Sequence, residues 1–351
     1  MLNARIVKHS LDFKVPGKTS RGVLTQKECY FIILHDTVSN QFGIGECSTL
    51  PDLSLDHIPE YNSKITAVCQ LINGGIEPMA IDLADFPSIV FGLEIAMADL
   101  SAKSMDQHIL FPSAFTAGTQ GIPINGLVWM GSREYMEQQI NEKLAQGFDT
   151  IKIKVGALDL ATELDILRNL RNQFSSDIIT IRLDANGAFE KENALEILGQ
   201  FAPFDIHSIE QPIRQGQPEA MASLCRDSPI PIALDEELIG RFSTTEKEEL
   251  LRFINPAYLI LKPSLIGGFK ASESWIALAE KQQIGWWMTS ALESNIGLNA
   301  IAQWTYLLNN PLPQGLGTGQ VYTNNIQSPL TISKGKLFYD HAHSWDLNLF
   351  Q

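Results

Sequence analysis

The sequence predicts an α/β protein in which a closed (β/α) barrel of the TIM type follows a smaller α+β unit. Its 351 residues suit two domains or one large barrel with additions. Short apolar runs, each followed by a segment of helical period, recur between residues 123 and 318. This alternation indicates parallel strands joined by helical crossovers. Eight repeats within about 195 residues favour a closed barrel, and an open doubly wound sheet is the structural alternative.

Composition and charge narrow the class of protein. Hydrophobic residues make up 44% of the chain and charged residues 19%, which is typical of a packed core. The net charge of -14 argues against nucleic acid or an anionic membrane as a partner. The longest apolar stretch is interrupted by Glu94 and Asp99 and is too short to span a bilayer. The N-terminal residues lack the apolar segment of a signal peptide, so we expect a cytoplasmic protein.

The first third of the chain is expected to form the α+β unit. Strand patterns cover 1–15, 28–36 and 42–46, and helical patterns lie around 60–74 and 88–104. Gly43 and Gly45 mark a backbone that another segment approaches closely. The loops at 17–26 and 48–57 lie beside these strands, and we expect them to close over the barrel mouth. Arg21, in the first loop, could meet a substrate carboxylate there.

The barrel strands are expected at 123–129, 150–155, 178–184, 206–212, 231–235, 257–262, 284–290 and 312–318. Between them, Ser243 and Glu246 form a capping-box pattern at the start of a helix. The stretch 296–308 is apolar nearly all round, so we expect a buried helix there. Adjacent Trp286 and Trp287 should face opposite sides of their strand.

Ionised side chains end five successive predicted strands, namely Lys154, Asp184, Glu210, Asp235 and Lys262. Each lies about one βα unit after the last, so all five should stand in one layer at the barrel mouth. The two-residue period of a strand places Lys152 and Arg182 on the same inner face, next to this layer. Any one of these acids alone could be a solvated loop charge. Five in register predict a site, because buried unpaired charges are costly.

Three carboxylates from different strands suit Mg²⁺, with Mn²⁺ as an alternative ion. No His or Cys stands at these strand ends, which argues against zinc and copper. Lys154 and Lys262 should face each other across the metal, because their strands lie on opposite sides of the barrel. A Lewis-acidic metal stabilises the anion formed when a proton is removed next to a carboxylate. Lys152 and burial should lower the pKa of Lys154 so that it can act as the base.

The strand-end motifs resemble those of the enolase superfamily, in its muconate-lactonizing subgroup; they read IKIKVG, RLDANGAF, IEQP, ALDEE, ILKPSLIGG and MTSALESNIG. A lysine or histidine base that works together with Mg²⁺ is a known property of that superfamily. The resemblance implies a capping domain over 1–118, a (β/α)7β barrel over 119–319, and a C-terminal segment, 320–351, that returns to the cap. It also implies the metal ligands Asp184, Glu210 and Asp235, the acid/base pair Lys154 and Lys262, and the supporting groups Asn186 and Glu236.

Within the subgroup, the chain is most similar to the o-succinylbenzoate synthases of menaquinone biosynthesis, through SALESNIGLNAIAQ and GLGTGQVYTNN. A mandelate-racemase type would carry a histidine base near Thr289. Dipeptide epimerases usually carry Asp-x-Asp at 315–320, where this chain has GLGTGQ. Dipeptide epimerisation and N-acylamino acid racemisation remain the alternatives. A non-catalytic binding or scaffold protein is disfavoured, because it would be expected to lose some of the five charged positions.

The implied reaction is the syn dehydration of 2-succinyl-6-hydroxy-2,4-cyclohexadiene-1-carboxylate, a small anionic carboxylate, through an enediolate. Lys154 would remove the proton and return it to the departing hydroxide, while the Lys262 cation stabilises the anion from the other side. Ser290 and the backbone N–H groups around Gly297 are expected to bind the succinyl carboxylate, if a helix over 292–308 begins there.

Overall fold

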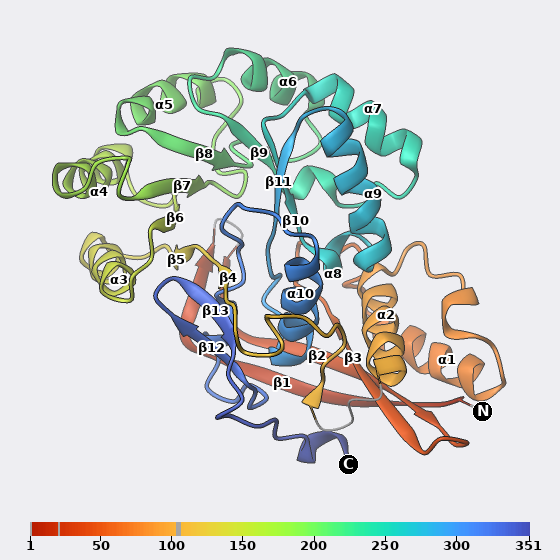
Figure 1. The fold of residues 1–351 in the computed structure, drawn as a ribbon. Helices are drawn as coiled ribbons and strands as arrows, with labels where there is room; N and C mark the ends of the chain where they lie inside the picture. Colours follow the sequence, from red (N-terminus) through yellow and green to blue (C-terminus); the bar gives the residue numbers. More distant parts are fainter. Residues whose placement is uncertain (1, 20–21, 103–106) are drawn as a thin grey trace.

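The computed structural model describes residues 2–19, 22–102 and 107–351. An antiparallel sheet with its helices lies beside a curved parallel sheet that is surrounded by an outer row of helices, and both chain termini lie on the side of the antiparallel sheet (Figure 1). The predicted fold class is confirmed, since an α+β unit precedes a curled (β/α) sheet.

The N-terminal sheet has the order β1-β2-β3, with the strands β1 (Leu2–Thr19), β2 (Gly22–Asp36) and β3 (Gln41–Ser48). The helices of this unit are α1 (Tyr61–Asn73), η1 (Pro78–Ala80) and α2 (Pro87–Ala102). α2 presses directly on β3: a Cβ atom on Gly45 would lie 1.8 Å from the carbonyl oxygen of Gly92. A Cβ on Gly43 would lie 2.0 Å from that of Ala96. The close approach predicted from these two glycines is therefore confirmed.

The second sheet contains seven parallel strands in sequence order: β5 (Gly126–Val128), β6 (Thr150–Lys154), β7 (Thr180–Asp184), β8 (Ile206–Glu210), β9 (Ile232–Leu234), β10 (Tyr258–Leu261) and β11 (Gly285–Met288). The α-helices that follow are α3 (Arg133–Ala145), α4 (Leu160–Gln173), α5 (Ala194–Phe201), α6 (Pro218–Asp227), α7 (Thr244–Ile254), α8 (Pro263–Ile266), α9 (Gly268–Lys281) and α10 (Asn295–Leu307). The short 3-10 helices are η3 (Ala202–Phe204), η4 (Glu236–Leu238), η5 (Thr318–Gln320) and η6 (Asn348–Phe350).

The eighth predicted strand is reduced to two isolated parallel bridges. Gly315 pairs with Thr289 just after β11, and Gln314 pairs with Ile124 just before β5. The segment therefore joins the last strand of the sheet to the first, where an eighth strand would close the barrel. Pro313 precedes this pair and cannot donate a backbone hydrogen bond, which limits the length of the ladder.

The C-terminal segment forms a third, small sheet and also contacts the N-terminal sheet. β12 (Leu330–Ser333) and β13 (Lys336–Tyr339) form a hairpin, and β13 pairs with the short β4 (Ile122–Pro123) ahead of the parallel sheet. The segment also reaches the N-terminal sheet, because the amide of Lys14 donates to the carbonyl of Val321 at 2.8 Å. Further along, the rings of Phe31 and Phe350 meet edge to face at 4.9 Å.

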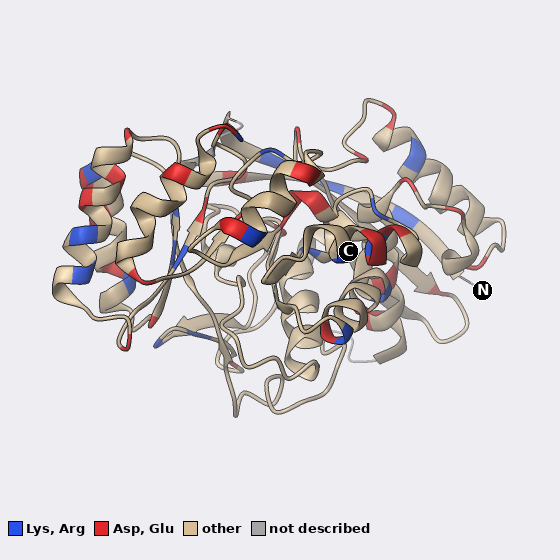
Figure 2. Cartoon of the chain, turned by 90° about the horizontal axis from the view of Figure 1, so that it is seen from above, with Lys and Arg blue, Asp and Glu red and all other residues tan. Residues whose placement is uncertain are grey.

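Local signals in the sequence have the expected outcomes. α7 begins with the capping box of Ser243 and Glu246, and α10 is buried along most of its length. Trp286 joins the main hydrophobic core, whereas Trp287 belongs to a small cluster with residues of β9 and β10. No helix in the described ranges is long and apolar enough to cross a membrane. Acidic and basic residues are interspersed along the outer helices (Figure 2).

Candidate active site

The strand ends of the parallel sheet bring the five predicted charged side chains together. Lys154 of β6 is in register with Asp184 of β7, which is in register with Glu210 of β8. Asp235 and Lys262 directly follow β9 and β10. Each of the five side chains is buried, with Lys262 the most exposed at 9%. The common layer expected from the spacing is therefore present.

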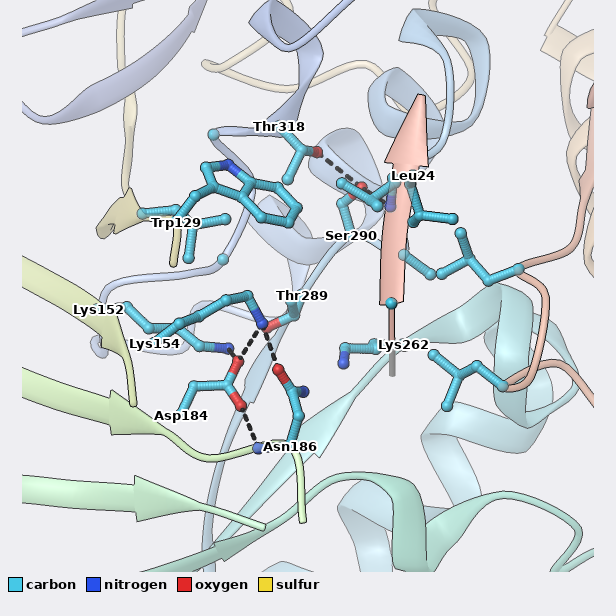
Figure 3. Close-up of a pocket in the computed structure, with 18 of the residues that line it drawn as sticks. Leu24, Trp129, Lys152, Lys154, Asp184, Asn186, Lys262, Thr289, Ser290 and Thr318 are labelled. Carbon is cyan, nitrogen blue, oxygen red and sulfur yellow. Dashed lines mark hydrogen bonds and ion pairs between the residues drawn. The ribbon is translucent and has the colours of Figure 1, made fainter. Parts of the chain in front are cut away.

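Lysine ammonium groups bridge the three carboxylates. The Nζ atom of Lys152 lies 2.9 Å from Asp184 and 2.6 Å from Glu210. Lys154 lies 3.0 Å from Asp184, while Lys262 pairs with Asp235 and lies 3.8 Å from Glu210. In Figure 3, Lys154 and Lys262 approach from opposite sides of the pocket.

The electrostatic balance differs between the two ends of this cluster. Burial disfavours the charge on Lys152, but Asp184 and Glu210 outweigh this effect and raise the pKa of its ammonium above the ordinary range. Burial raises the pKa of Asp235 well above its usual value, and the neighbouring charge of Glu236 adds to the effect. The ammonium of Lys262, which pairs with Asp235, opposes this rise but does not outweigh burial.

These residues fit a divalent cation. Glu210 Oε1 is buried and accepts no hydrogen bond, which is costly for a carboxylate oxygen. The donor set consists of hard carboxylate oxygens, which suits Mg²⁺. Among the residues that the structure describes, no three acidic, histidine or cysteine side chains form a ready-made metal cluster. The lysine ammonium groups, which bridge the same oxygens, act there as the counter-ions.

Asn186 and Glu236 hold Lys154 from the side of β7. Lys154 Nζ donates to Asn186 Oδ1 at 2.5 Å, and Asn186 Nδ2 donates to Glu236 Oε1 at 3.2 Å. Asn186 adopts a left-handed backbone with φ of 46°, which its short amide side chain tolerates better than most. The backbone turn thus aims the amide oxygen at the lysine.

Arg182 lies deeper in the sheet than the strand-end layer. Its guanidinium stacks 3.8 Å from the ring centroid of Trp287 and donates to the carbonyl of Pro313 at 2.7 Å. Burial lowers the pKa of Arg182 to about 10, although Glu210 opposes this change. Arg182 is absent from the pocket lining, so it supports the floor of the site from within the sheet.

Ser290 and Gly297 both have protein partners that the sequence did not reveal. Ser290 Oγ donates to Glu293 at 2.5 Å and accepts from Thr318 at 2.8 Å, as Figure 3 shows for the second bond. The amide of Gly297 donates to Glu46 at 2.9 Å, and α10 begins later than expected. Ser290 still lines the pocket, whereas Gly297 does not. Both groups were expected to donate to the substrate, but each donates to a buried carboxylate of the protein, Glu293 or Glu46, which needs a hydrogen-bond donor.

The pocket above the charged cluster has a volume of about 340 Å³. Gly22, Val23 and Leu24 at the start of β2 line it, as does the second cap loop at 50–53. Both segments therefore lie at the mouth as expected, but the described part of 17–26 forms the ends of β1 and β2 rather than a loop. Arg21 lies outside the described residues. On the barrel side, Trp129 contributes one wall, with its ring 5.7 Å from Lys154 Nζ.

Two lining residues were missed by the sequence reasoning. Thr289 Oγ1 and Asn125 Oδ1 are buried, line the pocket and have no hydrogen-bond partner in the protein. Thr289 directly follows β11, so its position at a strand end was the signal that could have identified it. Asn125 lies in an irregular segment before β5 and carries no comparable pattern.

Comparison with known proteins agrees with this geometry. The enolase C-terminal domain-like family matches residues 135–340, well over half of the chain. The chain belongs to the enolase superfamily. The o-succinylbenzoate synthase of Desulfotalea psychrophila is 43% identical over 93% of this chain and 96% of its own.

Two solved structures of the superfamily extend the comparison. The crystal structure of MenC from Desulfotalea psychrophila has a TM-score of 0.85 and 40% identity, covering 96% of this chain and 99% of the other. A dipeptide epimerase from Cytophaga hutchinsonii, complexed with Mg and D-Ala-L-Val, has a TM-score of 0.80 over 99% of this chain and 97% of its own. At 21% identity, the second likeness shows the shared superfamily fold alone.

Proposed function

We propose that this chain is an Mg²⁺-dependent o-succinylbenzoate synthase, a carbon–oxygen lyase. The observation that carries the proposal is the 43% identity to a curated o-succinylbenzoate synthase over nearly the whole of both chains. The reaction would remove water from 2-succinyl-6-hydroxy-2,4-cyclohexadiene-1-carboxylate and leave an aromatic ring. The buried lysines and the apolar cap loops around one pocket suit a small carboxylate with a hydrocarbon ring.

In this proposal Lys154 is the base and Lys262 is the opposing cation. Neutral Lys154 takes the proton from the carbon that bears the carboxylate, and the resulting ammonium returns it to the hydroxide that leaves the neighbouring carbon. One lysine can serve both steps because the two groups leave from the same face. Asn186 fixes the Lys154 side chain through the 2.5 Å hydrogen bond. Lys262 faces the other side, where its charge stabilises the developing anion.

Asp184, Glu210 and Asp235 would hold the metal, which supplies Lewis-acid stabilisation of the substrate carboxylate. Thr289 and Asn125 offer unpartnered polar atoms to the remaining polar groups of the substrate. Leu24, with the other cap residues, excludes water from the reacting atoms.

An epimerase or racemase acting on dipeptides or N-acylamino acids is the second candidate. The opposed lysines favour it, since such reactions need an acid and a base on opposite faces. Residues of 315–320 that line the pocket are Gly315, Gly317 and Thr318, so this segment presents no carboxylate to a substrate ammonium. That lining favours the dehydratase.

The decisive experiment incubates the Mg²⁺-loaded protein with the cyclohexadiene substrate and follows aromatisation by ultraviolet absorbance. We expect rapid turnover that is lost in Lys154→Ala. A parallel assay in D₂O measures deuterium incorporation into dipeptides and N-succinylamino acids, in the parent and in Lys262→Ala. Rapid epimerisation with the cyclohexadiene left intact would refute the proposed function.

The remaining parts of the proposal concern organisation and context. We infer a capping domain over 1–118, joined by 320–351, and a barrel domain over 119–319, in line with the contacts between β1 and the C-terminal segment. A place in menaquinone biosynthesis and a cytoplasmic location follow from the proposed activity.

A further inference from the structure

Among the residues that the structure describes, a buried lysine outside the catalytic cluster has only neutral hydrogen-bond partners. Lys27 lies on β2 and is 3% exposed. Its Nζ atom donates to the carbonyl of Leu292 at 2.8 Å and to the hydroxyl of Ser48. A buried ammonium held by neutral oxygens loses much of its hydration energy without the compensation of an ion pair. Such a lysine does not stabilise the fold by its charge, and a functional role would explain its presence.

The partners of Lys27 belong to the segments that form the apolar part of the pocket wall. Leu24 lines the pocket three residues before Lys27 on the same strand. Leu50 lines it two residues after Ser48, and Leu292 lines it directly. One ammonium group therefore ties together three segments that are distant in sequence. Lys27 itself does not line the pocket, so it acts through these neighbours.

Leu292 is the strained member of this wall. Its φ of 63° places a branched side chain in the left-handed region, which such residues rarely adopt. A second donor, the hydroxyl of Tyr322, meets the same carbonyl at 2.7 Å. Strained backbone of this kind persists where the surrounding structure fixes it, and it concentrates at ligand sites. Lys27 and Tyr322 together hold the Leu292 carbonyl.

We propose that Lys27 is a positioning residue that sets the spacing of the Leu24, Leu50 and Leu292 wall, and thereby the affinity for the substrate arm remote from the reacting carbons. Leu24 lies on the side of the pocket opposite Asp184 (Figure 3). The carboxylate next to the reacting carbon lies near the charged cluster in this proposal, so the succinyl arm contacts the wall of Leu24, Leu50 and Leu292. This inference rests on the proposed function, because that function supplies the succinyl arm.

The test compares two ligands of Mg²⁺-loaded protein by calorimetry: o-succinylbenzoate, which has the arm, and benzoate, which lacks it. In Lys27→Met we expect the affinity for o-succinylbenzoate to fall about tenfold, or about 1.4 kcal/mol, while that for benzoate changes less than twofold. KM should rise with little change in kcat, and Lys27→Arg should restore part of the loss. Lys8→Met, an exposed lysine of the same sheet paired with Glu28, is the matched control and should match the parent.

Each result bears on one statement. Equal losses for both ligands, or no loss for either, in a folded Lys27→Met protein would overturn the positioning role. If Lys27→Met fails to fold, Tyr322→Phe removes the other donor to the same carbonyl; it should give a smaller loss confined to o-succinylbenzoate, and no loss would overturn the inference. A parent protein that binds o-succinylbenzoate no better than benzoate would instead refute the proposed function.

Discussion

Replacing Glu46 by alanine should lower the free energy of unfolding more than the removal of a carboxylate at the surface. The reason is that the Glu46 side chain joins the cap to the barrel. Glu46 is fully buried on β3 and accepts hydrogen bonds from the backbone of Ser294, the hydroxyl of Ser294 and the backbone of Gly297, at 2.9, 2.5 and 2.9 Å. These donors belong to the first turn of α10, where a negative charge is favoured. Three charge-assisted bonds, at about 1.5 kcal/mol each, give a loss of about 4.5 kcal/mol for Glu46→Ala.

The assay is urea unfolding followed by far-ultraviolet circular dichroism. Glu46→Gln keeps one acceptor oxygen, so its free energy of unfolding should fall by about half as much, or about 2 kcal/mol. Glu28→Ala is the matched control, since its side chain is 58% exposed and pairs with an exposed lysine, Lys8; its effect should stay within about 0.5 kcal/mol. If Glu46→Ala were no less stable than Glu28→Ala, the inference that this carboxylate couples the two parts would be wrong.

Three further predictions test separate features. Gly45→Ala forces a Cβ to 1.8 Å from a backbone oxygen and should cost at least about 3 kcal/mol of unfolding free energy. In the control Gly199→Ala, the new Cβ has nothing within 4 Å, and the change should stabilise α5 by up to about 1 kcal/mol. Equal urea midpoints for the two variants would contradict this prediction. Burial, with the charge of Arg182, lowers the pKa of His207 from 6.5 to about 4, so the unfolded chain binds more protons and stability falls as pH drops from about 6.5 towards 4. His207→Gln should lose that part of the acid sensitivity in urea titrations at successive pH values, and an unchanged pH profile would exclude it. Glu210→Gln should weaken Mg²⁺ binding at least tenfold in calorimetry, and an unaltered affinity would remove Glu210 from the ligand set.

The charged layer of the site could be predicted because it repeats with the fold. A βα unit returns the chain to the same end of the barrel, so regular spacing alone placed Lys154, Asp184 and Glu210 at one end of the sheet. The strand period placed Arg182 on the same inner face, where it contacts Trp287. Periodic features of this kind need no knowledge of distant segments.

The contacts between the cap and the barrel could not be predicted in the same way. Glu46 is separated by 248 residues from Ser294, and Lys27 by 265 from Leu292. No local pattern records such a pairing. The unexpected partner of the Gly297 amide has this origin. A helix N-terminus indicates that an anion binds there, but not whether the anion is a ligand or a side chain of the protein. Likewise, the Ser290 hydroxyl donates its hydrogen bond to the buried carboxylate of Glu293.

The pairing of both chain ends has a consequence for synthesis on the ribosome. The strands of residues 2–48 emerge first, yet the edge of β1 at Asp12 and Lys14 hydrogen-bonds to Val321 and Thr323. At roughly 5–20 residues per second, that edge must wait roughly 15–60 s for its partner. During this interval an unpaired strand is exposed to pairing with other nascent chains. The nascent chain is therefore most prone to aggregate until its last thirty or so residues are released. Completion of the N-terminal sheet alone does not end this period.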